Sequence, residues 1–214
     1  MHPLLLQTKE LLSAAPFDWA VCGGYAIDLF LGRVTRVHGD IDLCAFEKDR
    51  PAIQRFMLEK GWNVYEFRGM GKVRPLELSS VSDAGRNLMC FLPGCDLVQF
   101  YPCEDEGLLY HQFFPKGMTE LNYLEFLFSP THDDALIFSQ SPAIRRELDK
   151  AILHRDGIPC LAPEIALLHK AREPERPESA ADFQAAFPFM DAEQKRWVLD
   201  SICCLHPDGH PWQP

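Results

Sequence analysis

The chain has 214 residues, of which 47% are hydrophobic and 24% are charged, a balance typical of a folded globular protein rather than a disordered one. Its formal net charge of −10 argues against a surface that neutralises many nucleic-acid phosphates, so nucleic acid is a disfavoured partner. A local basic pocket for one triphosphate remains compatible with this charge.

The first half of the chain alternates strand and helix patterns. In chain order we expect a helix, a strand and a helix at residues 4–14, 19–22 and 25–31, then a strand at 40–46 and a helix at 49–60. Further strands are expected at 63–67, 76–80, 87–92 and 96–101. The aromatic stretch 110–128 is irregular and is compatible with sheet, core or the wall of an acceptor pocket.

The second half is expected to be mainly helical. Helix patterns cover residues 143–154, 162–170, 180–187 and 191–205, and a charged, proline-rich loop covers 172–179. The predicted fold class is therefore α/β (α+β). A mixed sheet with helices forms a catalytic domain over residues 1–140, and a smaller helical region covers residues 141–214.

The eight cysteines lack the paired C-x-x-C spacing of a zinc site and are expected to be reduced, small hydrophobic residues. The apolar amino-terminal residues are too few for a signal peptide, and no later stretch has the length of a membrane span. These patterns predict a cytoplasmic protein without a membrane partner.

Asp40 and Asp42 lie two residues apart on a predicted strand, which puts both carboxylates on one face. A divalent cation relieves the repulsion between them, and Mg²⁺ is typically bound by one or two carboxylates together with substrate phosphates. A solvated strand face explains a lone D-x-D equally well.

Gly23 and Gly24 lie between the predicted strand and helix, where backbone N–H groups and the helix dipole favour a phosphate. An ordinary tight turn explains a bare Gly-Gly pair as well. The order strand, Gly-Gly, helix, basic loop and D-x-D strand is more specific than either piece.

This run, from Cys22 to Leu43, resembles the signature of the DNA polymerase beta-like nucleotidyltransferase superfamily. The Gly-Arg-x-Thr-Arg-x-His sequence at 32–38 resembles more narrowly the aminoglycoside 2″-adenylyltransferase and lincosamide branch. The resemblance implies a Mg²⁺-dependent enzyme that moves a nucleoside monophosphate from a nucleoside triphosphate, with ATP favoured, to a hydroxyl of a small acceptor. An aminoglycoside or lincosamide antibiotic is the implied acceptor, and antibiotic resistance the implied role.

The resemblance also implies roles for residues outside the D-x-D strand. Asp96 would be the third carboxylate, as a metal ligand or as the base that takes the acceptor's proton, and Glu77 is the competing candidate. Arg36 and Lys170 would contact the triphosphate together with the Gly-Gly turn. The family's Lys-Asp pair before a further Asp-Phe is reduced here to Asp182-Phe, which departs from the family pattern.

Three alternatives stay open. Within the superfamily, a toxin-like enzyme could modify transfer RNA or a partner protein. A catalytically silent nucleotide-binding module could have kept the fold, although three converging carboxylates argue against it. A chance match in an unrelated α/β protein would also have to explain the segment around Lys170.

Overall fold

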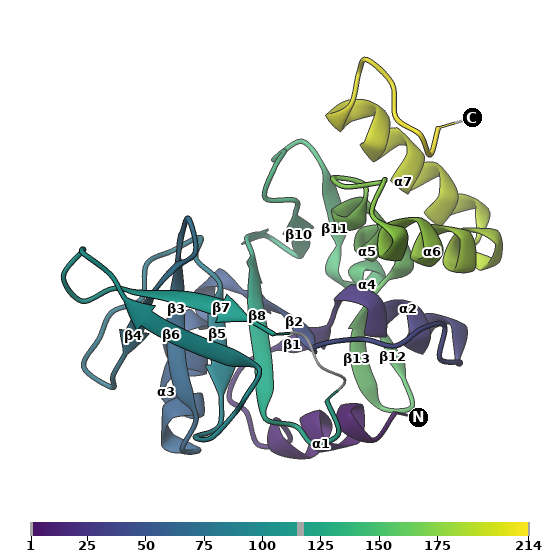
Figure 1. Ribbon diagram of the computed structural model, residues 1–214. Coiled ribbons are helices and arrows are strands. Elements are labelled where there is room, and N and C mark those ends of the chain that lie inside the picture. The colour runs from purple at the N-terminus through teal and green to yellow at the C-terminus, as the bar shows by residue number, and fades with distance from the viewer. Residues whose placement is uncertain (1, 115–117, 214) are drawn as a thin grey trace. The chain divides into compact units, whose positions relative to one another are not determined.

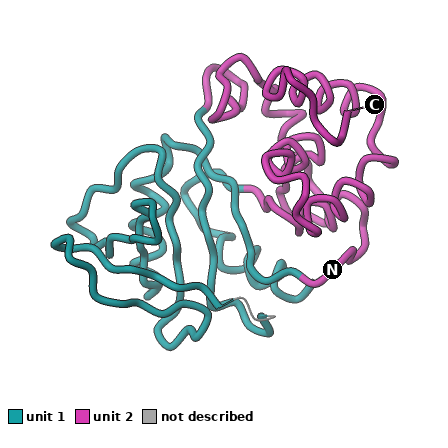
Figure 2. The backbone as a smooth tube through the Cα atoms, turned by 45° about the horizontal axis from the view of Figure 1, so that its top comes forward, with its two compact units in different colours: residues 1–19, 38–130 teal, residues 20–37, 131–214 magenta. Residues whose placement is uncertain are grey.

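The structure is a computed structural model that describes residues 2–114 and 118–213. The chain forms two compact units, the first from residues 1–19 and 38–130 and the second from residues 20–37 and 131–214 (Figure 2). The boundary expected between residues 140 and 141 lies inside the second unit. The segment 20–37, which comes early in the sequence, also belongs to that unit.

The first unit is built on a mixed sheet flanked by helices (Figure 1). Its helices are α1 (Pro3–Leu11), the 3₁₀ turn η1 (Glu47–Asp49) and α3 (Arg50–Glu59). Its strands are β2 (Asp42–Phe46), β3 (Asn63–Gly69), β4 (Lys72–Leu76), β5 (Leu88–Phe91), β6 (Val98–Pro102), β7 (Leu109–Phe113) and β8 (Tyr123–Ser129). They are ordered β2-β8-β5-β3-β4-β7-β6, and β2 and β8 are parallel while the other described pairs are antiparallel.

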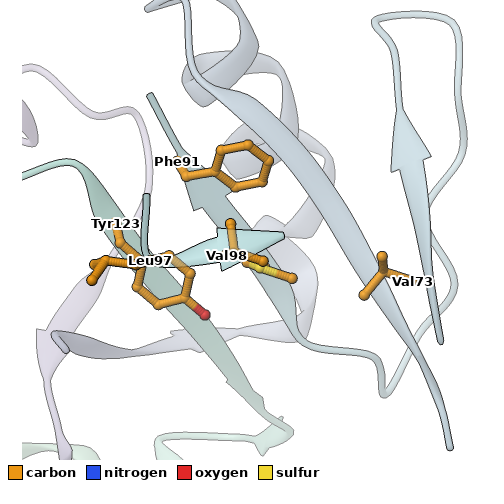
Figure 3. Packing of buried hydrophobic residues seen from close by; sticks show 6 residues of the cluster. Val73, Phe91, Leu97, Val98 and Tyr123 are labelled. Carbon is orange, nitrogen blue, oxygen red and sulfur yellow. The ribbon is translucent and has the colours of Figure 1, made fainter. Parts of the chain in front are cut away.

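Buried apolar side chains cover both faces of this sheet. Ile53 and Met57 on α3 are fully buried, as the helical spacing of apolar residues predicts. A second cluster joins four strands and the turn before β6 (Figure 3), and comprises Val73, Met89, Phe91, Leu97, Val98 and Tyr123. The burial of Tyr123 in this cluster matters for the candidate site, because β8 also carries the acidic residue Glu125 two positions later.

The second unit combines short strands with helices. Its strands are β1 (Trp19–Val21), β9 (Thr131–His132), β10 (Ala135–Ile137), β11 (Arg145–Glu147), β12 (Ile152–Arg155) and β13 (Ile158–Leu161). Its helices are α2 (Gly23–Leu31), α4 (Leu148–Ala151), α5 (Pro163–Lys170), α6 (Pro177–Ala186), η2 (Phe187–Phe189) and α7 (Ala192–Leu205). Strand β1 is parallel to β13, β12 is antiparallel to β13, and β11, β10 and β9 form a small antiparallel sheet.

The mixed α/β class is confirmed, but several elements differ from expectation. The helix expected over 143–154 is wrong, because these residues form β11, the single turn α4 and β12. Asp156 and Gly157 both have positive φ, 52° and 71°, so they form the tight turn of a β12–β13 hairpin whose pairing overrides the helical spacing.

Other differences concern element boundaries. The strand expected over 76–80 is wrong beyond Leu76. Strand β4 starts at Lys72 and ends at Leu76, which pairs with Val64 near the start of its partner β3. Helix α6 begins at Pro177, inside the expected loop 172–179. The aromatic stretch 110–128 contributes to β7 and β8, and its residues 115–117 lie outside the described residues.

All eight cysteines are free thiols, and burial raises the pKa of Cys44 and of Cys160 to about 11. Among the described residues, the helices are all too short or too polar to cross a bilayer.

Candidate active site

The two aspartates of the D-x-D sequence flank a buried residue where β2 begins. Ile41 between them is fully buried, while Asp40 and Asp42 are partly exposed. Asp42 is the first residue of β2, and Asp40 lies just before the strand. The backbone N–H of Glu125 donates to the Ile41 carbonyl at 3.2 Å, which ties this segment to the neighbouring strand.

Strand β8 places a third acidic residue beside this pair. In the parallel register of β2 and β8, Glu125 is the partner of Asp42. Its carboxylate accepts hydrogen bonds from Asn87 Nδ2 to Oε1 at 3.1 Å and from the Tyr123 hydroxyl to Oε2 at 3.4 Å. Asp42 and Glu125 therefore occupy paired positions on β2 and β8, and Asp40 lies two residues before Asp42. Two neutral donors orient the carboxylate on β8.

The charges of these residues act on one another. Burial, followed by the charge of Asp42 and then that of Asp40, raises the pKa of Glu125 to about 8. Burial and the charges of Glu125, Asp40 and Asp42 raise the pKa of Tyr123 well above its usual value, so its hydroxyl stays protonated. A site that disfavours ionisation of a third carboxylate in this way is suited to a bound cation.

The described residues do not form a complete metal-binding cage. Over residues 2–114 and 118–213, no group of three or more His, Cys, Asp and Glu side chains is arranged to hold a metal ion. Mg²⁺ is a hard cation that binds oxygen ligands and usually keeps several waters. Hard oxygen donors at Asp40 and Asp42 are of the right type for that ion.

The two residues considered as the third carboxylate lie elsewhere in the first unit. Asp96 is exposed in the turn before β6, and β8, β5, β3, β4 and β7 separate β6 from β2 in the sheet order. Glu77 is exposed in the turn after β4, and its backbone carbonyl accepts from Gln54 Nε2 at 2.9 Å. Neither is on a strand that pairs with β2.

The sequence reasoning did not single out Glu125, although a signal was present. It is the acidic residue of Tyr-Leu-Glu-Phe-Leu-Phe-Ser, which forms β8. A carboxylate in such an apolar strand loses hydration, and its presence there points to a functional or paired role.

In the second unit, the Gly-Gly pair begins helix α2. Gly23 has a φ of 64°, a conformation that glycine adopts without steric cost, and it is the first residue of the helix. Cys22 at the N-cap makes no side-chain capping hydrogen bond. The helix ends at Gly32 in the left-handed conformation, as expected.

The basic loop after α2 is held by two acidic residues. Asp28 on α2 accepts hydrogen bonds through Oδ1 from the Thr35 backbone N–H at 2.9 Å and from the Thr35 hydroxyl at 2.6 Å. Asp28 is only 6% exposed, so it has a structural role in shaping this loop. The next residue, Arg36, is held by a carboxylate from the distant helix α6.

That carboxylate is Asp182, and it also binds Lys170. Arg36 Nε and Nη2 donate to Asp182 Oδ1 and Oδ2, each at 2.9 Å, and Lys170 Nζ lies 2.7 Å from Asp182 Oδ2. Asp182 is fully buried, whereas the side chains of Arg36 and Lys170 are 23% and 16% exposed. The two cations predicted from the sequence are thus brought together.

The ion pairs outweigh burial in this cluster. Burial alone would raise the pKa of Asp182, but hydrogen bonds from Arg36 and Lys170 hold it below its usual value. Burial alone would lower the pKa of Arg36, but the hydrogen bond and charge of Asp182 raise it. Two cationic side chains around one carboxylate give this cluster a formal charge of +1, which suits an anionic ligand.

Comparison with known proteins points to the same family as the sequence motifs. Residues 4–92 match a family model described as aminoglycoside-2″-adenylyltransferase. No curated protein matches the chain at a significant level.

Two solved structures of ANT(2″)-Ia share the fold. The solution structure of the antibiotic-resistance factor ANT(2″)-Ia has a TM-score of 0.54 and 15% identity, over 96% of this chain and 92% of that chain. A crystal structure of ANT(2″)-Ia in complex with adenylyl-2″-tobramycin has a TM-score of 0.54 and 16% identity, over 96% of this chain and 99% of that chain. The lincomycin-bound lincosamide adenylyltransferase LnuA has a TM-score of 0.47 and 12% identity, over 94% and 96%. The first part of the chain, residues 4–92, therefore matches the aminoglycoside-2″-adenylyltransferase model, and the chain has the fold of ANT(2″)-Ia.

Proposed function

We propose that the protein is a nucleotidyltransferase that moves AMP from ATP to a hydroxyl of a small acceptor with the help of Mg²⁺. The observation that carries the proposal is the pairing of Asp42 on β2, two residues after Asp40, with Glu125 on β8. The match of residues 4–92 to a family of adenylyltransferases supports the same activity.

In this mechanism Asp40 and Asp42 would hold the cation. A bound Mg²⁺ would neutralise charge on the nucleotide phosphates, which favours attack at phosphorus. The acceptor oxygen forms a bond to the α-phosphorus, the bond to the bridging oxygen of pyrophosphate breaks, and the acceptor's proton passes to a carboxylate.

Asp96, Glu77 and Glu125 are the candidates for that carboxylate. Asp96 is the choice made from the family pattern, whereas Glu125 is supported by its register opposite Asp42 and by a raised pKa near neutrality, which suits a proton acceptor. Glu125 is the stronger candidate, because Asn87 and Tyr123 orient its two oxygens.

The triphosphate is assigned to residues of the second unit. The backbone of Gly23 and Gly24 at the start of α2, with Arg36 and Lys170, would bind the phosphates and offset the charge that develops on pyrophosphate. Their part is electrostatic and positional, since they hold the leaving group without taking part in proton transfer.

The acceptor is proposed to be an aminoglycoside or a lincosamide. The product adenylyl-2″-tobramycin in the ANT(2″)-Ia complex supports the aminoglycoside class, and the net charge of −10 favours a cationic acceptor. Such an activity would confer antibiotic resistance on a cell that makes the protein.

The test is to incubate the protein with Mg²⁺, labelled nucleoside triphosphates and a panel of aminoglycosides and lincosamides, and to follow pyrophosphate release. Parallel assays of Glu125→Gln, Asp96→Asn and Glu77→Gln identify the third carboxylate, because only the substitution at that residue should remove turnover. Turnover that survives in Asp42→Asn would refute the metal assignment. Bound nucleotide without turnover on any small acceptor would favour a macromolecular acceptor or a silent module.

A further inference from the structure

We propose that Asp182 is a positioning residue that holds Arg36 and Lys170 in place for the triphosphate, and that the C-terminal tail, residues 206–213, braces this cluster. The proposal rests on the proposed nucleotide site and adds residues outside it. All of them belong to the second unit.

The two cations share the carboxylate of Asp182. Both oxygens of Asp182 accept from the planar fork of Arg36, and Oδ2 also lies 2.7 Å from Lys170 Nζ. A bidentate arrangement fixes the plane of the guanidinium, while Lys170 keeps further N–H donors for a ligand. Arg36 Nη1 additionally donates to the Val37 carbonyl at 3.2 Å, which leaves its side chain little freedom.

The negative charge of Asp182 lies between two positive charges. Without the carboxylate between them, the positive charges of Arg36 and Lys170 repel each other, and the two side chains would move apart into solvent. Asp182 is fully buried and comes from α6, so it links the loop after α2 to the end of α5. Its function is then to keep both cations ordered before a ligand arrives, which lowers the entropy lost on binding.

The tail contacts the residues directly after both Lys170 and Asp182. His210 donates through Nε2 to the Ala171 carbonyl at 2.8 Å and accepts through Nδ1 from the Trp212 backbone N–H at 3.1 Å. Trp212, 9% exposed, stacks on Phe183 with ring centroids 4.3 Å apart.

The tail follows α7 and turns back beside it (Figure 1). Its Gln213 accepts from the His210 backbone N–H at 2.9 Å, and its side-chain amide donates to Cys203 on α7 at 3.0 Å. The Ala171 carbonyl, which accepts the hydrogen bond from His210, is one of the carbonyls at the C-terminus of α5 that have no partner within the helix. The tail therefore anchors the end of α5, where Lys170 lies, and the face of α6 next to Asp182.

The experiment measures binding of inorganic tripolyphosphate to the full chain by calorimetry, together with KM for ATP and for the acceptor in the pyrophosphate-release assay. The variants are Asp182→Asn, Asp182→Glu, Trp212→Ala and Trp212→Phe, each studied at a temperature where circular dichroism shows it folded. Glu66→Gln is the matched control, since Glu66 is a fully buried carboxylate between Arg68 and Arg74 in the first unit.

Asp182→Asn should bind tripolyphosphate about tenfold more weakly, because the amide has no charge and only one acceptor oxygen, so that both cationic side chains lose order. KM for ATP should rise while KM for the acceptor stays unchanged, a split that general destabilisation would not produce. Asp182→Glu, which keeps the charge, should recover part of the affinity. Trp212→Ala should weaken binding and Trp212→Phe should retain it.

Unchanged or tighter binding by Asp182→Asn, or an equal loss in Glu66→Gln, would overturn the positioning role of Asp182. Unchanged binding by Trp212→Ala would overturn the role of the tail. If tripolyphosphate binding depends on Asp182 but no pyrophosphate is released, the proposed function is refuted while the positioning role of Asp182 is supported. A wild-type chain that binds no tripolyphosphate would overturn the phosphate role of Arg36 and Lys170, and this inference with it.

Discussion

Replacing Glu125 by glutamine should change how the stability of the metal-free protein depends on pH. The pKa of Glu125 is about 8 in the folded chain, against 4.5 ordinarily, mainly because of burial and the charge of Asp42. The folded state therefore keeps a proton that the unfolded state has lost between these two values, so stability falls as pH rises through this window.

The size of the effect follows from linkage. The full difference in pKa corresponds to an upper bound of about 5 kcal/mol, and partial exposure of the side chain to solvent reduces the expected loss to about 2–4 kcal/mol. In the glutamine variant the side chain at position 125 carries no charge at any pH. The variant should therefore lack this fall of stability with pH. It should therefore be more stable than the wild type above pH 8, although it loses some of the bonding with Asn87 and Tyr123.

The assay is urea unfolding in the presence of a chelator over about pH 5 to 9, followed by circular dichroism, for the wild type and the glutamine variant. Adding Mg²⁺ above pH 8 should stabilise the wild type more than the variant, because an ionised carboxylate gains from a nearby cation. Parallel slopes for the two proteins would refute the coupling between Glu125 and the aspartate pair.

Three further outcomes are expected. Asp42→Asn should lower turnover by about a hundredfold or more and reduce stabilisation by Mg²⁺, as seen in pyrophosphate release and thermal unfolding; normal turnover would contradict it. Gly23→Ala should lose about 1–2 kcal/mol in urea unfolding because of its φ of 64°, whereas Gly24→Ala, which lacks a positive φ, should not show this strain. Glu164→Gln should lose about 3 kcal/mol by leaving buried Arg146 without its main partner, with the KM for ATP unchanged in kinetics; an altered KM would show that this pair also shapes the nucleotide site.

Local sequence patterns were sufficient for much of the fold. The strand, Gly-Gly and helix around Gly23, and the helices α3, α5 and α7, depend on spacing, turn residues and caps within a few positions. The expected helix over 143–154 was wrong because the partner of β12 lies beyond the Asp156-Gly157 turn, and helical spacing does not record that pairing.

The sequence by itself determined the D-x-D pair and the cations Arg36 and Lys170 as candidates, since adjacent residues and a family pattern identify them. The tertiary structure decided which residues stand next to them. Glu125 comes opposite Asp42 through the parallel register of β2 and β8, and Asp182 comes between the two cations through the packing of α5 and α6. Both neighbours result from contacts between residues far apart along the chain, which local periodicity does not encode.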